Sequence, residues 1–264
     1  MDLTYQEIPS ASPLVERIWH SRAQEAADFY SMADIHSELV VTRWHGKTTF
    51  TIRGPETHAT LARTQAGAEY FGIQFKTGVF MPAFPPALLV DRHDVHLPEA
   101  SSRSFWLAGA AWEFPTFENA DTFIHRLDRA GYLVHDPLVG DVLRQKPVDL
   151  SPRTVQRRFA QAAGLAHGAI YQIERARYAV SLLLDGVSIL DTVEAAGYFD
   201  QPHLTRALKR LIGLPPAYLL RKDRPERLSF LYKTSTVQDA ILMTHEQTGS
   251  RGESSIGRPL AIEF

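Results

Sequence analysis

Cysteine is absent from this chain of 264 residues, and its absence excludes disulfide bonds and thiolate metal sites. Long apolar runs are absent too, and none approaches the ~20 residues that a membrane-spanning helix needs. The N-terminus shows no basic stretch followed by an apolar core, so no secretory signal is visible. From these absences we expect a cytoplasmic protein with no membrane partner.

The motifs that commonly mark an enzyme are missing as well. The sequence contains no glycine-rich phosphate loop, no nucleophile elbow and no paired-carboxylate motif. The histidines that invite a metal interpretation are scattered along the chain: His36, His45, His58, His93 and His96. Scattered histidines are more often surface or hydrogen-bonded residues than ligands. We therefore predict no enzyme activity, no metal and no cofactor.

What is present is an uneven distribution of charge, which the net value of -2 hides. Residues 1–143 contain 11 Lys and Arg against 18 Asp and Glu, whereas residues 144–224 contain 13 against 7. At this length the chain suits two domains of ordinary size. A basic segment beside an acidic one is typical of a nucleic-acid-binding module joined to a different domain, although random scatter of charge is the alternative.

The basic segment begins with a helix of two contrasting faces. Ser151 and Pro152 give a start signal for this helix, and Gly164 gives the stop. Apolar side chains recur at helical spacing on one face. The opposite face carries Arg153, Gln156, Arg157 and Ala160. This is the pattern of a helix that packs on one side and presents basic and amide groups on the other.

A second unit of the same plan follows. Asp200 is a predicted N-cap and Pro202 lies in the first turn. Leu204, Leu208 and Leu211 form a buried stripe. The remaining positions form an exposed line of His203, Arg206 and Arg210, with Gln201, Thr205 and Lys209 beside it. A long helix predicted over residues 169–185 joins the two units.

The two basic helices favour DNA recognition. Arg, Gln, Thr and His side chains reach base edges and phosphates in a major groove. For one helix alone, a solvated surface face is the more common explanation. That explanation is less favoured here because the same plan occurs twice, each time with Pro in the first turn and Gly after the last.

At these residues the segment from about 143 to 221 resembles the DNA-binding domain of AraC/XylS-type transcription regulators. The resemblance covers roughly eighty residues and both helix-turn-helix units. It rests on Leu150-Ser-Pro with Arg157 and Phe159, Glu174-Arg-Ala-Arg177, Ile189 through Ala196-Gly-Tyr198, Asp200-Gln-Pro-His-Leu204 with Arg206, and Gly213-Leu-Pro-Pro216 with Tyr218.

The resemblance implies which side chains contact DNA. The matching positions of the first recognition helix are Arg153, Thr154, Gln156 and Arg157, and those of the second are Gln201, Pro202, His203, Thr205 and Arg206, with Lys209 and Arg210 in the same exposed line. Arg157 and Arg206 are the strongest candidates, since Arg grips guanine or phosphate bidentately.

Two positions depart from the family pattern. Pro147 interrupts the region before the first recognition helix, where the family has an Ala-containing helix, so the first unit is expected to be rearranged. In the second unit Val193 stands where the family prefers Ala, which is a small packing change.

The first 120 residues favour β structure. Short β-like runs separated by turn residues predict a small sandwich or barrel with strands near residues 39–42, 48–52, 70–75 and 87–90. A helix follows at residues 119–131. We therefore predict an α+β protein with a β-rich domain at 1–120, an all-α domain with two helix-turn-helix units at 121–224 and a tail at 225–264.

In the AraC/XylS family this half is a cupin-like effector-binding or dimerisation domain, and the resemblance implies the same here. Aromatic side chains are candidates for a ligand pocket: Trp44, Phe50, Tyr70, Phe71, Phe75, Trp106 and Trp112. The alternative for each of them is a place in the core.

The expected function is sequence-specific transcription regulation under the control of a small-molecule effector. The expected partners are double-stranded DNA, the effector, a second copy in a homodimer, and RNA polymerase. Two alternatives stay open. One is a ligand-independent regulator whose N-terminal domain only dimerises, and the other is a metal-dependent cupin-type enzyme fused to a DNA-binding domain.

Overall fold

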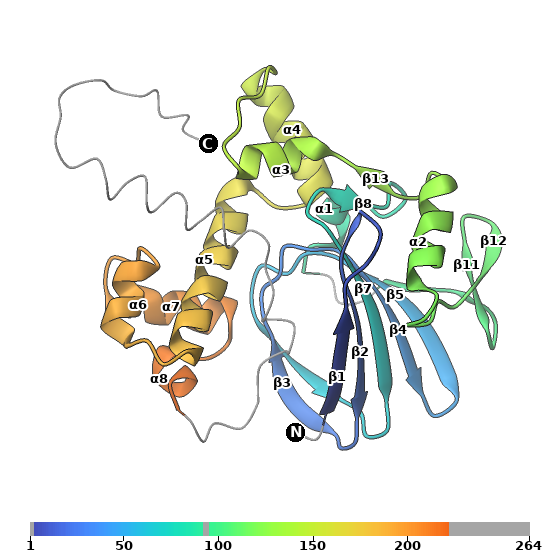
Figure 1. Ribbon diagram of the computed structural model, residues 1–264, viewed down its shortest axis with the longest axis horizontal. Coiled ribbons are helices and arrows are strands. Elements are labelled where there is room, and N and C mark those ends of the chain that lie inside the picture. The colour runs from blue at the N-terminus through green and yellow to red at the C-terminus, as the bar shows by residue number, and fades with distance from the viewer. Residues whose placement is uncertain (1–2, 92–94, 222–264) are drawn as a thin grey trace.

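The computed structural model describes residues 3–91 and 95–221, so the tail predicted at 225–264 lies outside the described residues. A β-rich N-terminal half is followed by a helical C-terminal half, as Figure 1 shows. This confirms the predicted α+β fold class.

The main element of the N-terminal half is a six-stranded antiparallel sheet with the order β1-β2-β7-β4-β5-β9. Its strands are β1 (Leu3–Ile8), β2 (Val15–Ala23), β7 (Glu69–Phe75), β4 (Glu38–Trp44), β5 (Lys47–Arg53) and β9 (Val95–Leu97). The strands predicted near residues 39–42, 48–52 and 70–75 are therefore confirmed as β4, β5 and β7.

A separate two-stranded ribbon is formed by β3 (Ala27–Ser31) and β6 (Thr60–Thr64). The pairings β4–β5, β3–β6 and β2–β7 are nested in sequence, one inside the next. The segment from β2 to β7 therefore folds as a long hairpin that doubles back between β4 and β5. The β3–β6 ribbon forms a second layer beside the six-stranded sheet.

The two faces of the six-stranded sheet differ in polarity. Successive side chains of a strand point to opposite faces. On β4, Leu39 and Val41 are buried in the apolar core, whereas the residues that alternate with them, Glu38, Val40 and Thr42, point to the other face. One face therefore packs on apolar neighbours and the other is free to line a polar space.

The apolar face packs against α2 (Ala120–Arg129), β11 (Ser104–Leu107) and β12 (Ala110–Glu113). The last two form a three-stranded sheet with β10 (Glu99–Ser101). The rings of Phe50 and Phe105 stack with centroids 4.1 Å apart. Phe123 and Leu127 of α2 are buried in the same core. The predicted boundary at residue 120 assigns this helix to the helical half, but its packing places it with the sheet.

Short elements connect the halves: β8 (Val79–Phe80), α1 (Pro86–Leu89) and β13 (Val134–His135). The strand predicted at residues 87–90 is wrong, because this stretch forms α1. Pro86 occupies the first helical position, where its missing N–H costs nothing, and Val90 donates its backbone N–H to the Pro86 carbonyl.

The helical half consists of α3 (Pro137–Leu143), α4 (Pro152–Ala163), α5 (His167–Leu184), α6 (Ile189–Ala195), α7 (Gln201–Leu211) and α8 (Pro216–Leu219). The start signals predicted at Ser151 and Asp200 are confirmed, because each side chain accepts a backbone N–H from the first turn. Asp136 and Ser188 cap α3 and α6 in the same way. None of the described helices combines the length and apolar character that crossing a bilayer requires.

The core of the helical half extends into the N-terminal half. It includes four residues from that half: Met32, Ala33, Ile35 and Phe80. Two backbone hydrogen bonds cross the junction, from Ala33 N–H to the Leu211 carbonyl and from Ala59 N–H to the Arg210 carbonyl, both at 2.8 Å. The β-rich half is thus docked on the end of α7.

Candidate nucleic-acid interface and the cavity beside it

The first basic helix, α4, leaves its polar face open. Arg153, Gln156 and Arg157 are exposed, while Thr154 is half-buried with its hydroxyl 2.9 Å from that of Ser151. The opposite face is closed, because Phe159 and the alanines near it lie in the core. The structure therefore brings the four predicted side chains together at one end of an anchored helix.

The connection before α4 explains the departure around Pro147. Helix α3 ends at Leu143, so eight residues separate it from α4. The two helices are nevertheless held together by Asp136, whose carboxylate accepts from both Nε (3.0 Å) and Nη2 (2.6 Å) of Arg158. Bidentate pairs of this kind fix orientation as well as distance. The first unit therefore has a long connection between α3 and α4, but the Asp136–Arg158 pair holds the two helices together.

The second basic helix, α7, also presents its predicted residues. Gln201, Pro202, Arg206, Lys209 and Arg210 are exposed, and His203 and Thr205 are half-buried. Leu204, Leu208 and Leu211 are buried, as predicted. His203, Arg206 and Arg210 line a groove between α7 and the start of α5, and Thr57 of the N-terminal half lies on its rim.

Helix α5 contacts the turn before α7 through Arg175. The Arg175 guanidinium lies 4.2 Å from the centre of the Tyr198 ring and donates to the Gly197 carbonyl at 3.3 Å. The Tyr198 ring in turn contacts the His203 ring edge-on. Helix α5 thus supports the second unit directly, and its 18 residues separate the two units by about 27 Å of helix rise.

Residues 146–222 match the family model described as "Helix-turn-helix domain". This segment is an AraC-type helix-turn-helix domain. Neither the curated proteins nor the solved structures give a match to the chain. The match covers less than a third of the chain, and it supports a DNA-binding role for this segment with DNA as the partner.

Beside the AraC-type domain, the N-terminal half contains a cavity of about 350 Å³. It lies between the polar face of the six-stranded sheet and the β3–β6 ribbon. The sheet contributes alternate residues, among them Trp19 and Ser21 of β2 and Glu38 of β4, and the ribbon contributes Phe29 and Ser31. One lining residue comes from the DNA-binding domain, namely Arg177 of α5.

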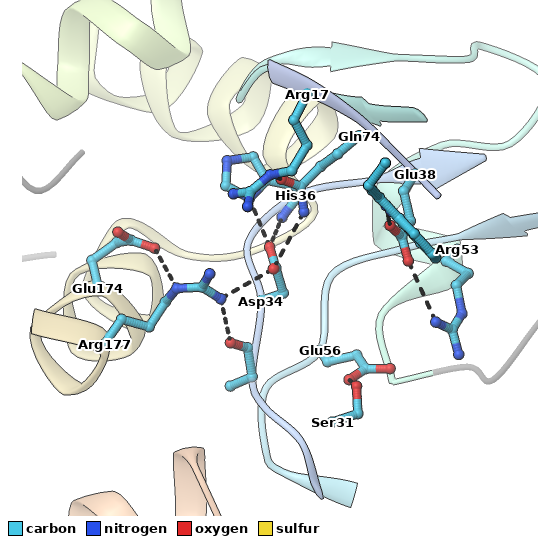
Figure 2. Close-up of polar contacts among 12 residues, drawn as sticks. Arg17, Ser31, Asp34, His36, Glu38, Arg53, Glu56, Gln74, Glu174 and Arg177 are labelled. Carbon is cyan, nitrogen blue, oxygen red and sulfur yellow. Dashed lines mark hydrogen bonds and ion pairs between the residues drawn. The ribbon is translucent and has the colours of Figure 1, made fainter. Parts of the chain in front are cut away.

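Arg177 joins the cavity wall to the DNA-binding domain through a buried ion pair. Its Nη1 lies 3.1 Å from Oδ2 of Asp34, and it also donates to the Ala33 carbonyl. The side chain of Arg177 is only 3 % exposed. Figure 2 shows the network, which runs from Arg17 on β2 through Gln74 and Asp34 to Arg177 on α5.

The carboxylates of the cavity differ in their electrostatic environment. Burial alone disfavours a charged Asp34, yet the guanidinium of Arg177 and the contacts of His36 hold the pKa of Asp34 well below its usual range. At Glu38 burial prevails, and it raises the pKa of Glu38 although the charge of Arg53 acts in the opposite direction.

The predicted aromatic ligand residues are dispersed. Tyr70 lines the cavity. Phe50, Phe71, Phe75 and Trp112 lie in the core on the opposite face of the sheet. Trp44 and Trp106 are more than 40 % exposed. Most of the residues that line the cavity are polar side chains and not the predicted aromatic ones.

The histidines take part in ordinary hydrogen bonds. His36 Nδ1 lies 2.7 Å from Asp34, and His96 Nδ1 lies 2.9 Å from the Thr51 hydroxyl. Within residues 3–91 and 95–221 no group of three or more His, Asp and Glu is arranged to hold a metal. His93 lies outside the described residues.

Proposed function

We propose that this AraC-type regulator is controlled by a small molecule bound in the cavity between the six-stranded sheet and the β3–β6 ribbon. The observation that carries the proposal is Arg177, which lines the cavity and belongs to the helix that joins the two helix-turn-helix units. A ligand in this cavity meets the DNA-binding domain directly, without any intermediate element.

Base readout is assigned to the exposed ends of α4 and α7. The residues are Arg153, Thr154, Gln156 and Arg157 on α4, and Gln201, Pro202, His203, Thr205 and Arg206 on α7. Lys209 and Arg210 are proposed to contact DNA phosphates. Support comes from their placement on open faces of helices whose other faces are buried. Two recognition helices at the ends of α5 suit successive major grooves ~34 Å apart.

The N-terminal half is proposed to be a cupin-like jelly roll. The nested pairings β4–β5, β3–β6 and β2–β7 support this assignment, because two layers of nested antiparallel strands define that architecture. The homodimer, the contact with RNA polymerase and the cytoplasmic location stay predictions. Sedimentation of the purified protein tests the first of them.

Control by a ligand requires that it bind two arrangements of the protein with different affinity. The junction offers such a difference, because Asp34 both faces the cavity and holds Arg177. A ligand that draws Asp34 away from Arg177 loosens α5 from the β-rich half. One that leaves the pair intact stabilises the docked arrangement. By linkage, DNA and ligand then alter each other's affinity by the same factor.

Selection of bound duplexes from a random DNA library, with full-length protein at moderate salt, tests the DNA-reading part. A bipartite motif with halves about one helical turn apart is the expected result. A single short motif assigns readout to one unit only. Absence of enrichment for full-length protein, with or without candidate effectors, contradicts sequence-specific recognition.

Replacing Arg157 or Arg206 with alanine is expected to weaken binding to the selected site by about 10- to 100-fold, since a bidentate arginine–guanine pair contributes about 1–3 kcal/mol. Each change also relaxes sequence preference in one half of the site. Fluorescence anisotropy with labelled duplexes measures both effects.

The matched control is Arg129→Ala, an exposed arginine at the end of α2 in the β-rich half. This variant should bind the selected DNA site with an affinity within about twofold of that of the native protein, as expected of a surface charge away from the interface. Equal losses from Arg129→Ala and Arg206→Ala would mean that only overall charge matters.

A further inference from the structure

The charged side chains that line the cavity leave an excess of negative charge. Three carboxylates face it, those of Asp34, Glu38 and Glu56. Of the three lining arginines, Arg63 is 61 % exposed and is paired with Asp28 on the outside of the ribbon. The interior therefore has three acids against the guanidiniums of Arg53 and Arg177, with His36 adding a cation only when it is protonated.

Glu38 is the carboxylate best placed to receive a cation from the ligand. Its side chain is 9 % exposed, and its contacts with Trp19 Nε1 (3.3 Å) and Arg53 Nη1 (3.4 Å) are long. Arg53 is one-third exposed, so solvent screens part of its attraction for Glu38. Burial and the neighbouring charge of Asp34 raise the pKa of Glu38, and a cation beside it offsets both effects.

A second polar group, the Ser21 hydroxyl, lies at the other end of the cavity. Ser21 is 1 % exposed, and within the described residues its hydroxyl has no hydrogen-bond partner. A buried unpaired hydroxyl costs about 1–3 kcal/mol, so a ligand that bonds to it gains affinity. Ser21 pairs in register with Tyr70, and Glu38 with Gln74, so the two groups lie four residues apart along β7.

An aromatic surface lies between these two ends. Trp19 occupies the register position opposite Gly72, midway between Tyr70 and Gln74. A Cβ on Gly72 would overlap the Trp19 indole, so this glycine lets the ring lie against the sheet. A flat indole beside a carboxylate is a favourable surface for an apolar or cationic ligand group.

We propose that the cavity binds a compact organic ammonium ion, with its amine at Glu38, its apolar frame against Trp19 and a hydrogen-bonding group near Ser21. A charge-assisted hydrogen bond in a water-poor space is about twice as strong as a neutral one. A bare metal ion is a poorer fit, since the described residues contain no suitable group of three donors. The volume of about 350 Å³ suits an arylalkylamine.

The test compares three molecules of nearly equal shape and different charge: 2-phenylethylamine, 2-phenylethanol and 3-phenylpropionate. Isothermal titration calorimetry with full-length protein, without DNA, measures their affinities. We expect the amine to bind at least about tenfold more tightly than the alcohol, and the carboxylate to bind most weakly. Tyramine, which adds a para hydroxyl group, should bind more tightly than 2-phenylethylamine.

Two variants locate the site. Glu38→Gln should abolish the preference for amine over alcohol, whereas Glu69→Gln, on the opposite face of the same sheet, should keep it. Ser21→Ala should remove the advantage of tyramine over 2-phenylethylamine. Because the Ser21 hydroxyl has no described partner, this variant is expected to fold normally even where Glu38→Gln does not.

Equal or tighter binding of the alcohol or the carboxylate overturns the proposal, and so does the absence of binding by all the amines. The proposal rests on the proposed function only in taking the cavity as the effector site. Failure of this test leaves DNA selection unaffected. Amine binding that leaves DNA affinity unchanged upholds the ligand class and contradicts effector control.

Discussion

Replacing Asp34 with alanine is expected to lower the free energy of unfolding by about 3–5 kcal/mol, the usual cost of removing one partner from a buried ion pair. The remaining guanidinium of Arg177 is 3 % exposed and loses a carboxylate at 3.1 Å. His36 loses its contact with the same side chain. Urea denaturation of the full-length protein, followed by circular dichroism, measures the change in midpoint.

The matched control is Asp28→Ala. Asp28 pairs with Arg63 at 3.5 Å, but both side chains are more than half exposed, so the expected loss is below about 1 kcal/mol. Similar losses for the two variants would show that the Asp34–Arg177 pair does not stabilise the junction. The double replacement Asp34→Leu with Arg177→Met should recover most of the stability, since apolar residues often replace a buried pair at little cost.

The stabilising effect of Asp34 also has a defined pH dependence. Its folded-state pKa lies below the unfolded value of about 3.9, so its contribution is complete above that value and is lost as the pH falls. The stability advantage of the native chain over Asp34→Ala should therefore shrink progressively below about pH 4. An advantage that stayed constant to pH 2 would contradict the ion pair as its source.

Replacing Gly164 with alanine is expected to destabilise the protein more than the same change at Gly186. Both glycines end a helix with positive φ, 73° and 88° respectively, where a Cβ costs about 1–2 kcal/mol. Gly186 has open space around it, whereas a Cβ on Gly164 would lie 2.8 Å from the backbone carbon of Pro86. Overlap with backbone adds about 1–3 kcal/mol.

The difference between these two variants isolates the docking of α4 on α1. Thermal and urea unfolding give the stabilities, and limited proteolysis reports whether the halves separate. We expect Gly164→Ala to expose the junction to protease while Gly186→Ala does not. Identical behaviour of both variants would mean that α1 yields to the new methyl group and that the contact is not tight.

The helical half was predictable because its signals are local. An N-cap needs only a side chain within three residues of the N–H groups that it accepts, so Asp136, Ser151, Ser188 and Asp200 are recognisable from sequence. The exposed residues of α4 and α7 follow from helical spacing in the same way. The family match at residues 146–222 confirms the helix-turn-helix domain.

The β-rich half was predictable only in part. Three of the four expected strands exist, but the strand at residues 87–90 is a helix, and strands such as β2 and β3 were missed. The alternation of Glu38, Val40 and Thr42 with apolar neighbours was the available signal for a polar sheet face. It did not reveal what covers that face, because the ribbon that covers it forms only when β3 pairs with β6, and these two strands are far apart in sequence.

By itself, the sequence determined the α+β class, the two helix-turn-helix units and the basic faces of α4 and α7, since caps and periodicity act over a few residues. Only the tertiary structure decided that α2 packs on the sheet, that four residues of the β-rich half enter the core of the helical half, and that Arg177 lines the cavity. Asp34 and Arg177 are 143 residues apart. Their contact depends on the docking of whole elements, which no local pattern encodes.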